Sequence, residues 1–536
     1  LVESTFRRVP LSEAVYSRHI ITNQDREETE GNFAKNRQES RHPKAWIGLG
    51  LDTVAEKHQC LIFAMTRKNA VAWAKEAGLD VVKELKPNQK KELEKISKKI
   101  LPKEDYDNTK LTSELAKTVK NGTAFHHAGL DQRCRTIIEN AFKNRHIKLL
   151  TATPTLAAGV NLPARRVVIP SVMRYTNNGL EKISILEYKQ MCGRAGRPQY
   201  DDMGESIIIA KGYPDEILEH YVDGEPEPLE SKTLDEDSSL RINLLGFIYT
   251  ASKFNPTSYE KIIKFFSQTF AAYQLSDDSV LEKKVTKQLE KLKEYGMITD
   301  ENGFEPTKFG IRIFYLRIDP ETAFDMTGYI EDYVRGTKHT FGILYMITNL
   351  HEFYSQYPIP DKYQGDMDDL IDPNEKLYRN QEFLREYCFK SLLILYKWID
   401  AMTYQNMSEH FDAEPGDIFY IKENAKNLVY IFTEIIKFWR DYAKENKQKK
   451  IVSEYQSLID ESDLLKLQIQ HGVPEKYLEL VKIKQIGRVR AQILYKNGFK
   501  NRLDLEKAKI EKLAKIDKIG LTIANNIKAE LTKIRY

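Results

Sequence analysis

The sequence predicts a multidomain α/β plus α protein, in which a parallel-sheet domain is followed by mainly helical domains. From residue 40 to residue 210, short apolar runs alternate with helical segments, as in a parallel sheet flanked by helices. Beyond residue 321 the pattern is nearly all helical and rich in aromatic residues. A chain of 536 residues is also too long for one hydrophobic core.

Five apolar runs are the expected strands of the sheet. They read CLIFAM (60–65), TAFHH (123–127), KLLTA (148–152), VVI (167–169) and SIIIA (206–210). A helix is expected over 68–77, directly after the first strand. Ligands of such sheets bind in the loops beyond the carboxyl ends of the strands, so the polar residues of those loops are the first candidates for a site.

Residues 237–320 are expected to form a winged helix. An amphipathic helix over 281–295 runs into Asn302-Gly303, and Asn-Gly between two short strands is the strongest local signal for a hairpin. A helix followed directly by a hairpin is how a winged helix ends; an unrelated helix and hairpin is the alternative. The acidic, proline-bearing segment 223–236 before it indicates a linker.

Residues 321–472 are expected to form a helical bundle. Its clearest helices are 383–401 and 425–442, and each carries a tryptophan, Trp398 or Trp439, among apolar residues at helical spacing. Such stripes usually form a core.

The last segment, 473–536, contains two similar units, 481–494 and 513–527. Each closes a short turn on Ile-Gly before a second helix, which is the helix-hairpin-helix pattern. Its glycine lets backbone N–H groups at a helix N-terminus point at a DNA phosphate. Both units depart from the usual Gly-x-Gly, because Gln485 and Lys518 stand where the first glycine often lies.

Composition excludes several classes of protein. The chain is 41% hydrophobic and 30% charged, and no apolar run reaches the ~18 residues that a membrane helix needs. Its 4 cysteines are scattered without a C-x-x-C pair, which argues against a metal site and a disulfide framework and suits a reducing compartment. Residues 481–536 contain 15 Lys/Arg against 5 Asp/Glu. This basic tail favours a nucleic-acid partner; a solvated lysine-rich face is the alternative.

Four segments carry the chemistry, and their order and spacing are highly specific. They are CLIFAMTRKNA (60–70), GTAFHHAGL (122–130), TATPTLAAGVNLPA (151–164) and EYKQMCGRAGRP (187–198). Together they resemble the second RecA-like domain of a superfamily-two helicase of the Ski-like branch. With the winged helix, bundle and helix-hairpin-helix, the chain resembles the archaeal Hel/Hjm DNA-repair helicases and their eukaryotic relative HELQ.

The resemblance implies a domain plan. Residues 1–40 would be the end of the first RecA-like domain and its linker, 41–222 the second RecA-like domain, 223–236 the acidic linker, 237–320 the winged helix, 321–472 a ratchet bundle and 473–536 the helix-hairpin-helix domain. The family's phosphate-binding loop and Asp-Glu-x-His motif do not occur in these 536 residues. We therefore expect the chain to be the carboxy-terminal portion of such a helicase, with ATP and Mg²⁺ bound mainly by the first RecA-like domain.

The resemblance also implies residue roles. Arg194 and Arg197 would face the nucleotide, one of them as an arginine finger, with no packing reason for either. Gln190 and the Gly159–Asn161 turn would line the same cleft. His127 and Gly129 would couple DNA to that cleft; for His127, a turn histidine with satisfied hydrogen bonds is the alternative. The expected nucleic-acid contacts are Thr66, Arg67, Thr153, Met173, Arg174, Tyr175, Trp398, Gly487, Arg488, Arg490 and Gly520.

Within this set, Met173, Arg174 and Tyr175 would lie near the tip of a hairpin that splits the duplex, and Trp398 would stack on a base along the ratchet helix. The expected function is an ATP-dependent 3′–5′ DNA helicase for forked or single-stranded DNA in repair of stalled forks. A stand-alone nucleic-acid-binding module and an RNA helicase are the alternatives. We expect this chain to bind DNA without hydrolysing ATP. It is also expected to be a cytoplasmic, nucleoid-associated archaeal monomer that meets replication or repair proteins.

Overall fold

The computed structural model describes residues 7, 9–30, 44–101, 109–156, 162–176, 179–198, 200–210, 212–234, 236–275, 277–335, 340–353 and 389–533. The chain divides into two compact units, each described by itself. Unit 1 contains Leu1–Pro228 and Tyr404–Asp417; unit 2 contains Leu229–Thr403 and Ile418–Tyr536. The boundary between Pro228 and Leu229 falls inside the acidic segment 223–236.

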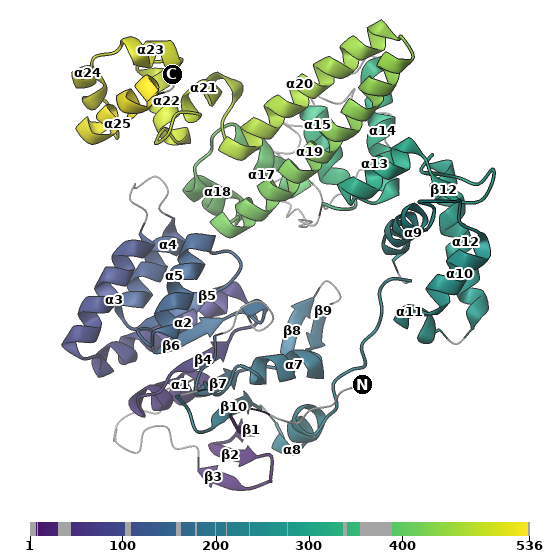
Figure 1. Ribbon diagram of the computed structural model, residues 1–536. Coiled ribbons are helices and arrows are strands. Elements are labelled where there is room, and N and C mark those ends of the chain that lie inside the picture. Colours follow the sequence, from purple (N-terminus) through teal and green to yellow (C-terminus); the bar gives the residue numbers. More distant parts are fainter. Residues whose placement is uncertain are drawn as a thin grey trace. The chain divides into compact units, whose positions relative to one another are not determined.

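Unit 1 is built on an eight-stranded sheet with the order β3-β2-β1-β10-β7-β4-β6-β5 (Figure 1). The strands are β1 (Leu11–Ser17), β2 (Ile20–Asn23), β3 (Glu28–Glu30), β4 (Cys60–Phe63), β5 (Thr123–His126), β6 (Leu149–Ala152), β7 (Arg166–Ile169) and β10 (Gly204–Ile209). From β1 to β5 along this order, neighbouring strands are parallel. The five apolar runs read from the sequence are all strands, and their continuous burial is what a sheet covered on both faces requires.

The expected domain boundary at residue 40 is wrong. β1 pairs in parallel with β10, with Ala14 opposite Ile207, and β2 and β3 extend the sheet in antiparallel fashion. Val15 is fully buried in the same core as the other strands. Residues 11–30 are therefore part of this α/β domain, which they join through the pairing of β1 with a strand far along the chain.

Helices surround the sheet of unit 1, as Figure 1 shows. They are α1 (Ala45–Ala55), α2 (Arg67–Glu84), α3 (Pro87–Ile100), α4 (Lys110–Lys120), α5 (Gln132–Lys143), α7 (Ile185–Cys192) and α8 (Pro214–Ile217), with a π-helical turn over Leu218–Val222. Side-chain caps start several of them: Thr66 accepts from the Asn69 N–H and Asp131 from the Cys134 N–H. A separate hairpin, β8 (Met173–Thr176) and β9 (Gly179–Lys182), lies between β7 and α7.

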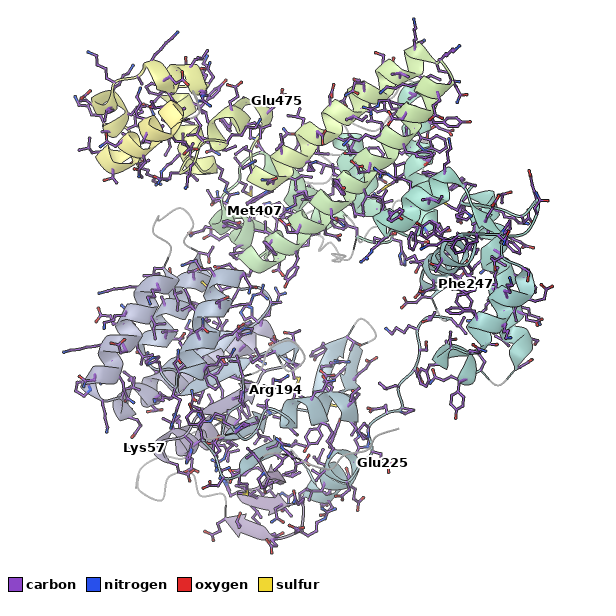
Figure 2. The ribbon with its side chains drawn as sticks, in the orientation of Figure 1. Lys57, Arg194, Glu225, Phe247, Met407 and Glu475 are labelled. Carbon is purple, nitrogen blue, oxygen red and sulfur yellow. The ribbon has the colours of Figure 1, made fainter. Side chains whose placement is uncertain are left out.

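One segment of the expected bundle belongs to unit 1. It contains α18 (Tyr404–Phe411), where Figure 2 labels Met407, and the first residues of α19 (Pro415–Glu445). The Gly416 N–H donates to the Gly129 carbonyl at 2.9 Å. A β-carbon on Gly416 would lie 2.0 Å from the Ala128 oxygen, so only glycine permits this backbone approach. Residues 321–472 are thus not one unbroken body.

In the residues of unit 2 that the structure describes, the secondary structure is helical apart from one hairpin. Its helices up to residue 471 are α9 (Asp237–Ala251), α10 (Tyr259–Ser267), α11 (Phe270–Tyr273), α12 (Asp278–Glu294), α13 (Lys308–Leu316), α14 (Pro320–Arg335), α15 (Thr340–Asn349), α17 (Phe389–Ile399), the rest of α19, and α20 (Lys449–His471). The hairpin, β11 (Ile298–Thr299) and β12 (Glu305–Pro306), directly follows α12 around Gly303, whose φ is +107°. The expected helix-then-hairpin order is confirmed.

The carboxy-terminal helices have a core of their own. They are α21 (Leu478–Val481), α22 (Arg488–Lys496), α23 (Arg502–Lys507), α24 (Ile510–Ala514) and α25 (Gly520–Lys533). Ile486 and Ile519, the two turn residues that precede the glycines, are both buried in this core. The two helix-hairpin-helix turns bury equivalent isoleucines, which explains why the Ile-Gly pair occurs in both of them.

Candidate nucleic-acid and nucleotide interface

Three of the four chemistry-bearing segments converge at the carboxyl edge of β4, β6 and β5. The Ala64 N–H donates to the Ala152 carbonyl at 2.7 Å, and the Thr153 N–H donates to the His126 carbonyl at 3.1 Å. These bonds bring the loops after the three strands side by side. The edge where the carboxyl ends of parallel strands meet is where ligands of such sheets bind.

The threonines of this edge are already engaged by their own loops. Thr66 caps α2, and the Thr153 hydroxyl lies 2.9 Å from that of Thr155. Thr153 is only 9% exposed, whereas Thr66 is exposed. Thr66 can therefore offer its hydroxyl to a phosphate, and Thr153 is mainly a loop-stabilising residue. The predicted Gly159 and Asn161 lie outside the described residues.

Arg67 lies at this edge but is held by a carboxylate of its own chain. Its two terminal nitrogens donate to the Asp417 carboxylate oxygens at 2.7 and 2.9 Å. The Arg67 side chain is 42% exposed, while that of Asp417 is 8% exposed. Asp417 lies in the first turn of α19, where the helix dipole stabilises a negative charge. Its carboxylate also accepts from the Glu414 N–H.

His127 is buried behind Arg67. Its ring stacks on Phe125 with 5.6 Å between centroids, and its Nδ1 accepts from the Gly129 N–H at 3.2 Å. Burial, with the positive charge of Arg67, lowers the pKa of His127 to about 3. His127 is therefore a neutral turn histidine next to Arg67, and a β-carbon on Gly129 would meet both side chains. Only one ring nitrogen is satisfied, because the buried His127 Nε2 has no hydrogen-bond partner among the residues that the structure describes, so both the coupling role and the turn-histidine alternative stay predictions.

The β8–β9 hairpin projects apolar and basic side chains. Tyr175 is 80% exposed and lies opposite Leu180, which is 54% exposed. Met173 pairs with Lys182 at the far end from the turn, and Arg174 forms an ion pair with Glu187 at 2.6 Å. Of the three residues expected near the tip, Tyr175 is exposed, whereas Met173 and Arg174 are partly buried. Residues 177 and 178 lie outside the described part of the chain.

The arginine-bearing segment lies at the other edge of the sheet. α7 ends at Cys192, and the loop after it, where Figure 2 labels Arg194, is pinned to residues that precede β7. The Ala164 N–H donates to the Arg194 carbonyl at 2.9 Å, and the Gly196 N–H donates to the Ala164 carbonyl at 2.7 Å. Gln190 is exposed on the last turn of α7. The first candidates for a site were the loops beyond the carboxyl ends of the strands, and this loop lies at the opposite edge.

The two arginines have different environments. Arg197 is 5% exposed; its Nε and Nη2 donate to the two carboxylate oxygens of Asp201 at 2.7 Å each, and its Nη1 donates to Gln59. Burial opposes ionisation of Asp201, yet hydrogen bonds and charge from Arg197 outweigh it and lower the pKa of Asp201. Arg197 therefore has a structural role, because it packs against Asp201 and Gln59. The expectation that neither arginine has a packing reason is wrong for Arg197.

Arg194 is the arginine of the pair with room for a ligand. It is partly exposed, and burial lowers the pKa of its guanidinium. A partly desolvated guanidinium binds phosphate oxygens strongly, through its planar array of N–H donors. The geometry thus favours Arg194 over Arg197 as the residue that meets a phosphate.

Trp398 is buried in this structure, and its stacking on a base stays a prediction. Trp398 is 3% exposed, and its indole N–H donates to the Ile469 carbonyl at 2.7 Å. The guanidinium of Arg488 lies 4.2 Å from the ring centroid, and a β-carbon on Gly472 would lie 2.5 Å from the ring. An aromatic residue at helical spacing was here a core residue, because a left-handed glycine after α20 lets the chain close over it.

Arg488 and Arg490 also point inward. They are 7% and 6% exposed, so little of either side chain is accessible to DNA, and the expected contact stays a prediction. Arg490 donates to the carbonyls of Gln485 and Lys518, at 2.6 and 3.0 Å, and so ties the two turns together. Gln485 and Lys518 have φ of +71° and +61°, the backbone conformation that the missing glycines would have adopted easily.

The glycines of both turns remain available. Gly487 and Gly520 are exposed, and Gly487 precedes α22 with no side-chain cap on its first N–H groups. Gly520 has φ of +53° at the start of α25. Both turns keep the backbone shape that offers N–H groups to a phosphate.

Sequence reasoning missed four residues that define these surroundings: Asp201, Glu414, Asp417 and Leu180. Asp201 stands four residues after Arg197, a spacing that could have indicated the pair. Asp417 lies 350 residues from Arg67, and no local pattern predicts that contact. In the part of the chain that the structure describes, no cluster of His, Cys, Asp or Glu could hold a metal ion, and no helix has the length and apolarity to cross a membrane.

A parallel sheet with this loop arrangement, followed by tandem hairpins, defines a helicase carboxy-terminal domain with a DNA-binding module. Comparison with known families agrees: the helicase conserved C-terminal domain matches residues 88–199, archaeal helicase domain 4 matches 341–456, and the SAM-like helix-hairpin-helix tandem matches 477–533. The chain belongs to the Hel308 family of archaeal DNA helicases.

Its relatives are similar over almost its whole length. The ATP-dependent DNA helicase Hel308 of Pyrococcus abyssi is 33% identical over 539 residues, which cover 98% of this chain and 70% of the relative. The Hel308 proteins of Pyrococcus horikoshii and Methanocella arvoryzae are each 32% identical, over 98% and 99% of this chain and 70% and 69% of the relative.

Proposed function

We propose that this protein is part of an ATP-dependent 3′–5′ DNA helicase that acts on forked or single-stranded DNA during repair of stalled replication forks. The observation that carries the proposal is that the candidate strand-binding loops and the candidate nucleotide-facing loop lie at opposite edges of one sheet. The loops with Thr66, Arg67 and His127 lie at its carboxyl edge, and the loop with Arg194 lies at its amino edge. Nucleotide state sensed at one edge can then change strand contacts at the other through a rigid sheet.

Arg194 is proposed to contact the nucleotide phosphates, which the first RecA-like domain of such a helicase would hold together with Mg²⁺. The guanidinium would stabilise charge that develops during phosphoryl transfer. Gln190, exposed on the last turn of α7, is proposed to line that cleft. Because the 536 residues contain no phosphate-binding loop of the Gly-Lys-Ser/Thr kind, we expect the chain by itself not to hydrolyse ATP.

Strand separation is assigned to the β8–β9 hairpin. Tyr175 and Leu180 are directly paired across its strands, and both are exposed. An apolar pair of this kind can stack on the last base pair of a fork. Residues 237–320 are proposed to be a winged helix, and the helices that follow a ratchet bundle, in line with the helix-then-hairpin order and the archaeal domain-4 match.

Binding of labelled DNA tests this function directly. The 536-residue chain is titrated against single-stranded DNA, forked DNA and single-stranded RNA of matched sequence, at several salt concentrations. We expect forked DNA to bind most tightly, with a steep loss of affinity as salt rises. Tighter binding of RNA favours the RNA helicase alternative. ATP hydrolysis by this chain alone, stimulated by DNA, would contradict the assignment of ATP and Mg²⁺ binding mainly to the first RecA-like domain.

A further inference from the structure

The ion pair between Arg67 and Asp417 is placed where a bound strand is expected. Its carboxylate accepts from both terminal nitrogens of the guanidinium, which is the same forked geometry that a phosphate would use. Arg67 therefore cannot offer that fork to a phosphate while the pair exists. Asp417 satisfies the guanidinium in a protein without nucleic acid.

The segment that carries Asp417 is seated by shape as well as by charge. Gly416 approaches the backbone at Ala128, and its N–H donates to the Gly129 carbonyl at 2.9 Å. Glu414 packs its β-carbon near Gly129, and Ser408 donates to the Glu414 carboxylate at 3.1 Å. Burial, with the neighbouring charge of Asp417, raises the pKa of Glu414.

The 404–417 segment ends where the chain passes from unit 1 to unit 2. Asp417 is the last residue of its segment in unit 1, and the rest of α19 belongs to unit 2. The contact that occupies Arg67 is therefore also the contact that fixes the start of a 31-residue helix to the α/β domain. Loss of the pair changes two things at once: the charge available to a strand and the anchoring of α19.

We propose that the 404–417 segment is an internal gate on the strand-binding edge, in which Asp417 occupies Arg67 until a phosphate of single-stranded DNA takes its place. The inference rests on the proposed function, because it requires a strand at this edge. Asp417 acts through Arg67 and is a positioning residue, not a group that touches DNA.

The test compares variants of the full 536-residue chain for binding to a fluorescein-labelled oligothymidylate. Asp417→Asn removes the competing charge and is expected to tighten binding about threefold to tenfold. Glu409→Gln removes one exposed charge from the same segment and is the matched control for net charge. Gly416→Ala unseats the segment without changing any charge and is expected to tighten binding in the same direction, which covers the case in which Asp417→Asn folds poorly.

Two further variants separate a gate from a plain structural clamp. Arg67→Gln is expected to weaken binding and to reduce the slope of log affinity against log salt by about 0.7, the loss of one phosphate contact. In Arg67→Gln/Asp417→Asn, the gain from Asp417→Asn is expected to vanish. Thermal unfolding of each variant shows that it is folded.

The possible results have distinct meanings. A gain in Asp417→Asn no larger than in Glu409→Gln, or a gain that persists without Arg67, overturns the gate while leaving the proposed function standing. Weaker binding by Gly416→Ala also overturns it. No binding of the oligothymidylate by the unaltered chain overturns the proposed function and the gate together.

Discussion

Arg197 and Asp201 form a buried ion pair within four residues of chain, with side chains 6% and 0% exposed. Two parallel hydrogen bonds of 2.7 Å join the guanidinium to the carboxylate, and Arg197 also donates to Gln59, the residue that precedes β4. The pair therefore fastens the arginine-bearing loop to the sheet. Arg194, three residues earlier, is left as the arginine that a ligand can reach.

Arg197→Ala is expected to destabilise unit 1, because it leaves the Asp201 carboxylate buried without its partner. The expected loss is about 3–5 kcal/mol in free energy of unfolding, measured by calorimetry. Arg194→Ala serves as the control and should change stability by less than about 0.5 kcal/mol. Equal losses from the two variants would contradict this division of roles.

His127 is expected to make stability depend on pH. Its pKa is about 3 in the folded protein and near 6.5 when exposed, so the unfolded chain binds the extra proton below pH 6.5. Stability from this group is therefore complete above about pH 6.5 and is lost as pH falls, by up to about 1.4 kcal/mol per pH unit. Denaturation from pH 7 to 4 should show a shallower slope in His127→Gln than in His220→Gln, which alters an exposed histidine.

Replacing Tyr175 and Leu180 by Ala is expected to reduce the preference for forked over single-stranded DNA by about fivefold or more, since the stacking pair is lost. Both side chains are more than half exposed, so thermal unfolding should not change. Leu79→Ala, at another exposed leucine of unit 1, is the matched control. An unchanged fork preference would remove the hairpin from the mechanism.

Trp398→Ala is expected to act on stability. The ring fills a buried space between Gly472, Ile469 and Arg488, and removing it should cost about 3–5 kcal/mol. Calorimetry of the whole chain measures this loss. If Trp398 instead stacked on a base, single-stranded DNA affinity would fall while the unfolding temperature stayed the same.

Lys518→Gly is expected to stabilise the carboxy-terminal helices by about 0.5–1 kcal/mol. Lys518 is held at φ of +61°, which glycine adopts without strain. Lys515→Gly is the comparison, because Lys515 has φ of −80° and should lose stability on the same change. Hydrogen exchange of α24 and α25 reports both effects.

The strands of the sheet could be read from sequence because each is a short apolar run buried on both faces. The hairpin after α12 was equally local, since Asn302-Gly303 specifies its turn. β1 was missed because its partner β10 is far along the chain. The 404–417 segment was placed in the bundle because helical periodicity says nothing about which domain a helix packs on.

The sequence by itself determined the family, the five apolar strands of the sheet, and the loops that carry Arg67, His127 and Arg194, because motif spacing and hydrophobic periodicity are local properties. Only the tertiary structure decided which charged and aromatic residues are available. Arginine and tryptophan are residue types that often bind ligands, yet Arg197, Arg490 and Trp398 are each buried. Each one donates a hydrogen bond to a residue outside its own motif. Availability depends on what lies against a side chain, and contacts between distant segments form only when the chain packs.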